Sequence, residues 1–143
     1  MRRTKVALFV HFVWATWDRM PLLTEETERR IYHSIQATCV ELSAEVIALG
    51  GVEDHVHLLV RLPATLAPSL FVKHVKGSSA HLATHMVAPD RFFKWQGSYA
   101  AFSISSNDLD RLCAYITHQK EHHRRGTIIP EWEEELDASP SDS

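Results

Sequence analysis

Residues 54–60 carry the pattern that most limits how this chain folds. The run Asp54-His55-Val56-His57-Leu58-Leu59-Val60 sets two histidines around one apolar residue, at the head of an apolar stretch. In an extended strand, side chains two residues apart point to the same face, about 6–7 Å apart along the strand. His55 and His57 would then share one face of a sheet. Two neutral imidazoles on one rigid face can ligate a divalent cation, although one buried and one exposed histidine with ordinary hydrogen bonds would give the same pattern.

The patterns on either side of this strand predict a small α+β domain. Runs of β-branched and aromatic residues predict strands, and apolar residues at helical spacing predict helices. We expect strands over 5–15, 45–49, from 55 onward and 92–104, and helices over 24–42, 71–86 and 107–124. Gly50-Gly51 is expected to form the hairpin turn. The order β-α-β-β-α-β-α is that of a ferredoxin-like antiparallel sheet with two helices on one face and an added C-terminal helix. The other face is free to carry a site, which His55 and His57 would face.

The charges are unevenly distributed along the chain. The 143 residues carry a net charge of −3, but six of the 18 acidic residues lie in 131–143, which contains no Lys or Arg. The rest of the chain therefore has 15 basic against 12 acidic residues, a balance that is compatible with nucleic acid without requiring it. We expect a single domain over residues 1–130 and a disordered acidic tail over 131–143.

The sequence predicts a cytoplasmic protein without a membrane partner. Its apolar runs are too short to span a bilayer, and the basic start is followed by a strand pattern without a small-residue cleavage site. Cys39 and Cys113 fall in predicted helices and lack ligand spacing. This favours free thiols of a reducing compartment over a disulfide.

The C-terminal helix carries a second group of residues with chemical potential. Tyr115 and Gln119 are four residues apart and would lie one turn apart on one face. A phenol can act as a nucleophile toward phosphorus, and an amide oxygen can complete the coordination of a hard cation. A packed tyrosine and a solvated glutamine are the ordinary alternatives. His118, His122 and His123 are close in sequence, so a site made of histidines alone stays open. Glu53-Asp54 could add carboxylate ligands, although a solvent-exposed turn is the simpler interpretation.

Taken together, these motifs resemble the single-tyrosine HUH transposases of the IS200/IS605 type over about residues 5–125. The resemblance rests on five pieces in the same order, which are residues 11–16 (His-Phe-Val-Trp-Ala-Thr) with Arg19, residues 54–58, residues 76–79 (Lys-Gly-Ser-Ser), residues 95–99 (Trp-Gln-Gly-Ser-Tyr), and Tyr115 with Gln119.

The resemblance implies a metal-dependent tyrosine endonuclease and strand transferase that moves single-stranded DNA. In that family two histidines and a glutamine bind Mg²⁺ or Mn²⁺, which assigns His55, His57 and Gln119 to the metal here. Tyr115 would attack the phosphate and leave a 5′-phosphotyrosine and a free 3′-hydroxyl. The resemblance also implies recognition of subterminal hairpins, a homodimer in which the tyrosine helix can act in trans, and work at the nucleoid of a bacterium or archaeon.

Basic residues outside these motifs are candidates for contacts with DNA. The candidates are Arg3, Lys5, Lys73, Lys76, Arg91, Lys94 and Arg124, although each is individually an ordinary solvated charge. Gly77 lies inside the second predicted helix, where glycine costs about 1 kcal/mol relative to alanine. The close approach of a phosphate, a local kink or tight helix–sheet packing would each account for it.

Three alternatives stay open from the sequence. The first is a domesticated relative that processes chromosomal repeats with the same chemistry. The second is a non-catalytic hairpin-binding protein, which the intact set of His55, His57, Tyr115 and Gln119 disfavours. The third is a metal-dependent hydrolase of small phosphate esters, which would use water as its nucleophile and would not need Tyr115.

Overall fold

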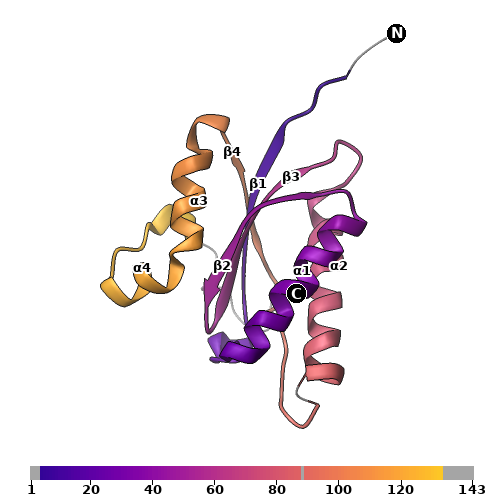
Figure 1. Ribbon diagram of the computed structural model, residues 1–143, viewed down its shortest axis with the longest axis vertical. Helices are drawn as coiled ribbons and strands as arrows, with labels where there is room; N and C mark the ends of the chain where they lie inside the picture. Colours follow the sequence, from indigo (N-terminus) through magenta and orange to yellow (C-terminus); the bar gives the residue numbers. More distant parts are fainter. Residues whose placement is uncertain (1–3, 88, 134–143) are drawn as a thin grey trace.

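The protein folds as one four-stranded antiparallel sheet covered by helices on both faces (Figure 1). The computed structural model describes residues 4–87 and 89–133. The elements are β1 (Leu8–Ala15), α1 (Glu25–Glu41), β2 (Glu45–Val52), β3 (His55–Leu62), α2 (Pro68–Leu82), β4 (Ala100–Ile104), α3 (Leu109–Thr117) and α4 (Gln119–Arg125). The strand order is β2-β3-β1-β4. This confirms the predicted α+β, ferredoxin-like fold, with α1 and α2 on one face of the sheet and α3 and α4 on the other.

The main apolar core lies between the sheet and the pair α1 and α2. Phe12 and Trp14 of β1 and Val56, Leu58 and Val60 of β3 are fully buried there. They pack against a set of side chains from the two helices, namely Ile31, Ile35, Cys39, Phe71, Val72 and Val75. The strict alternation along β3 sends His55, His57 and Leu59 to the opposite face, as the sequence predicted.

The hairpin between β2 and β3 differs from the prediction. Gly50 and Gly51 lie inside β2, and the turn is formed by Glu53 and Asp54. Gly50 is required by packing instead, because a Cβ built on it would lie 2.2 Å from the backbone oxygen of Ile116 in α3. Without a side chain at Gly50, α3 can lie directly on the strand.

The last strand and the last helix are also shorter than predicted. Residues 92–99 mostly form a loop, in which only Trp95 forms an isolated antiparallel bridge, to Thr16. The single helix expected over 107–124 is interrupted at His118, whose φ of −107° and ψ of 30° end α3 before α4 begins. Tyr115 and Gln119 therefore belong to two helices rather than to successive turns of one.

Two of the sequence motifs hold this loop in place. The ammonium of Lys76 on α2 donates to the backbone oxygens of Gln96 and Ser98, at 2.5 Å and 3.1 Å. The indole nitrogen of Trp95 donates to the hydroxyl of Ser79, one turn further along α2, at 3.0 Å. Residues 76–79 and 95–98 are thus joined to each other, at some distance in sequence from the histidines. Gly77 between them has open space around it, which rules out tight helix–sheet packing as its cause.

Part of the predicted acidic tail is structured. Residues Pro130–Trp132 form a short 3-10 helix, and Glu133 follows it. Residues 134–143 lie outside the described residues, and so does the remainder of that prediction. Cys39 and Cys113 are free thiols. No helix in the described ranges is long and apolar enough to cross a membrane.

Candidate active site

The two histidines of β3 lie at the centre of the sheet. His57 pairs with Val13 of β1 and with Gly50 of β2, and His55 pairs with Ala15 and Val52. Both histidine side chains are fully buried, on the face that α3 and α4 cover. Because a neighbouring strand holds β3 on each side, the backbone that carries both imidazoles is fixed on both edges.

The ring of His55 is oriented by an acidic neighbour. Its Nδ1 lies 2.8 Å from a carboxylate oxygen of Asp54, and the other oxygen of Asp54 accepts a hydrogen bond from Nε of Arg19 at 3.2 Å. Asp18 and Arg19 both have a φ of 54°, an unfavourable backbone region for non-glycine residues. The resulting tight turn carries the guanidinium of Arg19 to Asp54. A carboxylate only accepts hydrogen bonds, so Nδ1 of His55 carries a hydrogen, and Nε2 is directed into the site.

Tyr115 of α3 lies next to the two histidines. Leu112 and Ile116 of α3 pack on Ala48 and Leu59 of the sheet, which turns the adjoining face of the helix toward the histidines. The ring of Tyr115 lies edge-on to that of His57 with 6.0 Å between their centroids. Tyr115 and the histidines of its own chain therefore share one site.

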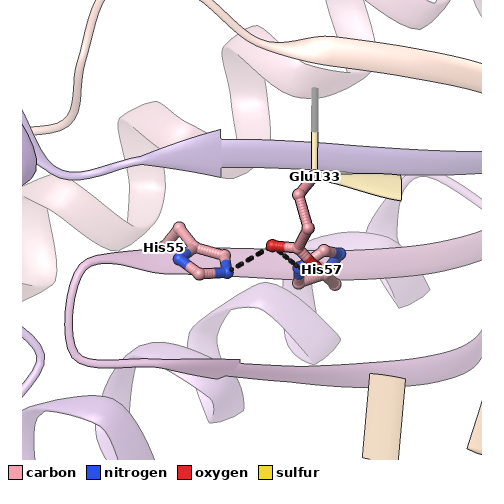
Figure 2. A group of neighbouring side chains, drawn as sticks. All are labelled: His55, His57 and Glu133. Carbon is pink, nitrogen blue, oxygen red and sulfur yellow. Dashed lines mark hydrogen bonds and ion pairs between the residues drawn. The ribbon is translucent and has the colours of Figure 1, made fainter. Parts of the chain in front are cut away.

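Glu133 joins the three side chains. The chain reverses at Gly126, which has a φ of 72°, and Trp132 then packs edge-on against Tyr115 with a centroid distance of 5.0 Å. The carboxylate of Glu133 lies 3.1 Å from Nε2 of His55 and 3.1 Å from Nε2 of His57. It also accepts the hydroxyl hydrogen of Tyr115 at 2.5 Å. Figure 2 shows this carboxylate entering between the two imidazoles from the side opposite β3.

The environment shifts the pKa of each of these groups. Burial opposes the charge of Glu133, but hydrogen bonds from His55 and His57 outweigh burial and hold its pKa well below the usual range. Burial, together with the bond to Glu133, raises the pKa of Tyr115 to about 12. Burial lowers the pKa of His57 despite Glu133, whereas for His55 the bonds to Asp54 and Glu133 overcome burial and raise the pKa. Glu133 is thus a carboxylate at neutral pH, and Tyr115 is a neutral phenol.

Gln119 is close to the cluster, as the sequence predicted, but at its edge. Its side chain is buried, and its Oε1 lies 3.4 Å from Nε2 of His55. His123 of α4 also belongs to the cluster, since its Nε2 lies 3.3 Å from Glu133. The ring of His122 is tilted against that of Tyr115 with 4.7 Å between centroids, and His118 bonds to the backbone oxygen of Ala114.

This donor set fits a divalent cation. His55, His57 and Glu133 each offer one ligand atom, and these atoms lie within 4.8 Å of one another. Two imidazole nitrogens with a carboxylate oxygen, and an amide oxygen from Gln119 beside them, are a mixture that Mn²⁺ and Mg²⁺ accept. The cluster could therefore hold a metal, and the identity of the ion does not follow from the ligands alone.

The predicted DNA-contacting residues fall in several places. Lys5, Lys73, Arg91, Lys94 and Arg124 are exposed, Lys76 is bonded to the 96–98 loop, and Arg3 lies outside the described residues. Lys94 covers the ring of Trp17 at 4.0 Å. Arg124 lines a surface cavity of about 500 Å³ together with Arg19, Asp54, Lys120 and His123. This cavity includes His123 of the histidine cluster, and both basic and acidic side chains line it.

Sequence reasoning missed Glu133 because it assigned residue 133 to a disordered tail. A single glutamate among several acids carries no spacing signal, so nothing in the pattern separates it from Glu131 or Glu134. Asp54 was considered as a ligand, but the structure shows that it bonds to His55 instead.

Comparison with known proteins decides the family. A sequence profile described as "Transposase IS200 like" matches residues 4–119, which include His55, His57, Tyr115 and Gln119. The chain belongs to the IS200-like transposase family. As a member of this transposase family, it is expected to cleave DNA and transfer strands.

Relatives of this transposase come from bacteria. The ISDra2 transposase TnpA of Deinococcus radiodurans is 26% identical over 114 residues, which cover 76% of this chain and 81% of the relative. A transposase for insertion sequence element IS200 from Salmonella typhimurium is 25% identical over 122 residues, covering 81% and 79% of the two chains.

Solved structures share the fold of this transposase. The crystal structure of a Deinococcus radiodurans R1 protein assigned to the transposases superposes with a TM-score of 0.67 at 24% identity, over 83% of this chain and 98% of the other. A REP-associated tyrosine transposase bound to a REP hairpin superposes with a TM-score of 0.65 at 19% identity, over 86% and 73%.

Proposed function

We propose that this transposase cleaves and rejoins single-stranded DNA through a 5′-phosphotyrosine on Tyr115, with a divalent cation held beside it. His55, His57 and Gln119 are the proposed metal ligands, and Glu133 is a fourth donor that the sequence did not predict. The ion is proposed to be Mg²⁺ or Mn²⁺. When bound, it would supply positive charge that stabilises the phosphoryl oxygens and the departing 3′ oxygen.

One observation carries this proposal. Nε2 of His55, Nε2 of His57 and the hydroxyl of Tyr115 all contact the carboxylate of Glu133, at 3.1, 3.1 and 2.5 Å. A nucleophile and two metal-ligating nitrogens therefore converge on a space the size of one carboxylate. Such convergence is what phosphoryl transfer to a side chain requires, because most of its catalysis is positioning and charge stabilisation.

The proposed cleavage step exchanges one bond to phosphorus for another. The phenolic oxygen of Tyr115 forms a bond to phosphorus, the bond from phosphorus to the 3′ oxygen breaks, and the 5′ phosphate stays on Tyr115. The phenolic proton leaves to solvent, because the lowered pKa of Glu133 makes this carboxylate too weak a base to keep it, and the 3′ oxygen takes up a proton. The backbone N–H of Ile129 donates to the phenolic oxygen at 3.0 Å, which favours the phenolate as it forms. Rejoining is the reverse step with another 3′-hydroxyl.

The DNA strand is proposed to reach Tyr115 along the cavity lined by Arg19, Lys120, His123 and Arg124. Arg19, Lys120 and Arg124 line it beside the carboxylates of Glu53 and Asp54, and their positive charge would favour phosphates regardless of sequence. The REP-associated tyrosine transposase that shares this fold is bound to a REP hairpin, and we extend hairpin recognition to this chain as part of the proposal. The expected setting is the bacterial cytoplasm, with a single domain as the working unit. This domain extends past the predicted end at residue 130, because Glu133 is part of the cluster.

The decisive test is a search for a covalent adduct. The protein is incubated with Mn²⁺ and single-stranded oligonucleotides from both strands flanking its own gene, and the products are run on denaturing gels. We expect an SDS-resistant adduct with the wild-type protein, none with Tyr115→Phe, and none with His57→Ala. Tyr99→Phe is the matched control, because it removes a hydroxyl from a ring that packs on Phe12 in the main core, away from this site.

Other results would change the assignment. Cleavage without an adduct that persists in Tyr115→Phe would replace the tyrosine with a water nucleophile and indicate a metal-dependent hydrolase. Tight hairpin binding without any cleavage, on both strands, would indicate a non-catalytic binding protein. Subterminal hairpins flanking the gene would distinguish a mobile element from a domesticated nuclease.

A homodimer remains part of the proposal, and mixing variants tests how it works. Tyr115→Phe and His57→Ala are each inactive by expectation, and in a mixture a tyrosine acting in trans would restore the adduct. Since Tyr115 contacts the histidines of its own chain in this structure, we expect no restoration. An adduct in the mixture would mean that α3 exchanges between subunits.

A further inference from the structure

His11 is a buried histidine beside the site to which no role has been assigned so far. It lies on β1 opposite Leu59 and points to the same face of the sheet as His57. The two rings are stacked with 5.1 Å between centroids and 18° between planes. Phe102 of β4 lies against His11 at 5.9 Å, so its ring is confined by its neighbours. Nε2 of His11 and Nδ1 of His57 are 2.9 Å apart.

We propose that His11 is a positioning residue that accepts the Nδ1 hydrogen of His57 and thereby presents Nε2 of His57 to the metal. Two ring nitrogens at 2.9 Å share one hydrogen. A neutral imidazole that ligates through Nε2 carries its hydrogen on Nδ1, so Nε2 of His11 must then be the acceptor. This inference rests on the proposed metal site at His57.

The two proposed metal ligands are thus oriented by different kinds of partner. His55 donates from Nδ1 to the carboxylate of Asp54, which can only accept, so Nδ1 of His55 carries a hydrogen with and without a metal. His57 faces an imidazole, which either donates or accepts. The tautomer of His57 therefore follows whatever occupies its Nε2.

This difference predicts a paired change of tautomer. In the structure, Nε2 of His57 faces the carboxylate of Glu133 at 3.1 Å, which places its hydrogen on Nε2 and makes His11 the donor. When Nε2 becomes a ligand, each of the two rings gives up its Nε2 hydrogen and carries one on Nδ1. The pair holds two ring hydrogens before and after, so no proton is gained or lost. Within the described residues Nδ1 of His11 has no hydrogen-bond partner, and it would receive the hydrogen.

The first test distinguishes the hydrogen-bond acceptor of His11 from the packing of its ring. His11→Phe keeps a stacked ring but removes the acceptor, and His11→Gln keeps an acceptor near the position of Nε2. Mn²⁺ affinity is measured by calorimetry on the whole protein without DNA. We expect affinity about 10- to 100-fold weaker in His11→Phe and within a few-fold of wild type in His11→Gln. His74→Phe, at an exposed position on α2, is the matched control.

A second test needs no variant and so does not depend on the folding of His11→Phe. Nitrogen NMR of the wild-type histidines, with and without Mg²⁺, should show the hydrogens of both His11 and His57 moving from Nε2 to Nδ1. Nδ1 of His55 should carry its hydrogen in both states.

The outcomes distinguish this inference from the proposed function. If His11→Phe binds Mn²⁺ as tightly as wild type while His57→Ala does not bind, the role of His11 is overturned and the metal site stands. Unchanged tautomers of His11 and His57 in Mg²⁺-saturated protein would overturn it equally. If the wild-type protein binds neither ion, the metal site fails, and the inference fails with it.

Discussion

The two faces of β3 bury different chemistry on one backbone. Val56, Leu58 and Val60 point toward α1 and α2 into an apolar core, whereas His55 and His57 point toward α3 and α4 into a polar cluster. The apolar face is stabilised by the burial of apolar surface, which contributes roughly 1.5–3 kcal/mol for each fully buried aliphatic side chain. The polar face depends on hydrogen bonds and ion pairs between specific nitrogen and oxygen atoms. The apolar face of β3 therefore stabilises the fold, whereas the polar face forms a site only when α3, α4 and residues 129–133 pack against it.

Gly50→Ala should have the largest effect on stability and activity, because Gly50 lies at the contact between β2 and α3 on the polar face. The new methyl group would lie 2.2 Å from the backbone oxygen of Ile116, so strand and helix must separate. We expect destabilisation of about 1–3 kcal/mol or more and a loss of adduct formation of up to about a hundredfold. Denaturant unfolding and single-turnover cleavage measure the two effects. Full activity at reduced stability would mean that the position of α3 does not limit catalysis.

The next prediction concerns the ammonium of Lys76 on the opposite face. Burial lowers the pKa of Lys76 to about 8, whereas in the unfolded chain this lysine has an ordinary pKa of about 10.4. Between these two values the unfolded state binds more protons, so stability rises with pH. We expect wild type to gain about 1–2 kcal/mol between pH 8 and 10 relative to Lys76→Met, after discounting for partial exposure. Urea unfolding at both pH values measures this, and equal curves for the two proteins would contradict the shift.

The oxygen donors of the polar face should contribute less than its histidines. Glu133 contacts both imidazoles and Gln119 contacts one. We expect Glu133→Ala to weaken Mn²⁺ binding by about tenfold, or about 1.4 kcal/mol, and Gln119→Ala to weaken it by less. Calorimetry without DNA measures both changes. Tighter binding in Glu133→Ala would show that the carboxylate competes with the metal instead of holding it.

Gly77→Ala should have the smallest effect and the opposite sign to Gly50→Ala. Gly77 lies inside α2, and a Cβ added there meets nothing within 4 Å. Since alanine is the better helix former, we expect a gain of about 0.5–1 kcal/mol in the free energy of unfolding. Weaker binding to single-stranded DNA in the same variant, measured by anisotropy, would support close approach of a phosphate at this glycine. Unchanged binding would leave Gly77 without a role in DNA contacts.

Much of the secondary structure could be predicted from the sequence, because strand alternation and helical spacing depend on residues that are close together in the chain. The alternation in β3, the helical spacing in α1 and α2 and the order of the elements led to the correct sheet and to the correct face for His55 and His57. The chemistry of Tyr115 and Gln119 singled them out, and both lie within or beside the cluster. Some wrong details concern contacts with a distant segment. Gly50 was predicted to form a turn but lies in β2, where its missing side chain leaves room for the backbone of Ile116.

Sequence alone therefore determined the fold class and the sheet face of His55 and His57, since these depend on periodicity, and it singled out Tyr115 by the chemistry of its side chain. Only the tertiary structure decided that Glu133 enters between the two imidazoles, that Asp54 and His11 orient them, and that Lys76 bonds to a loop. Each of these contacts joins residues whose partners follow from no spacing rule. They form because buried polar groups must find partners wherever the packed chain provides them.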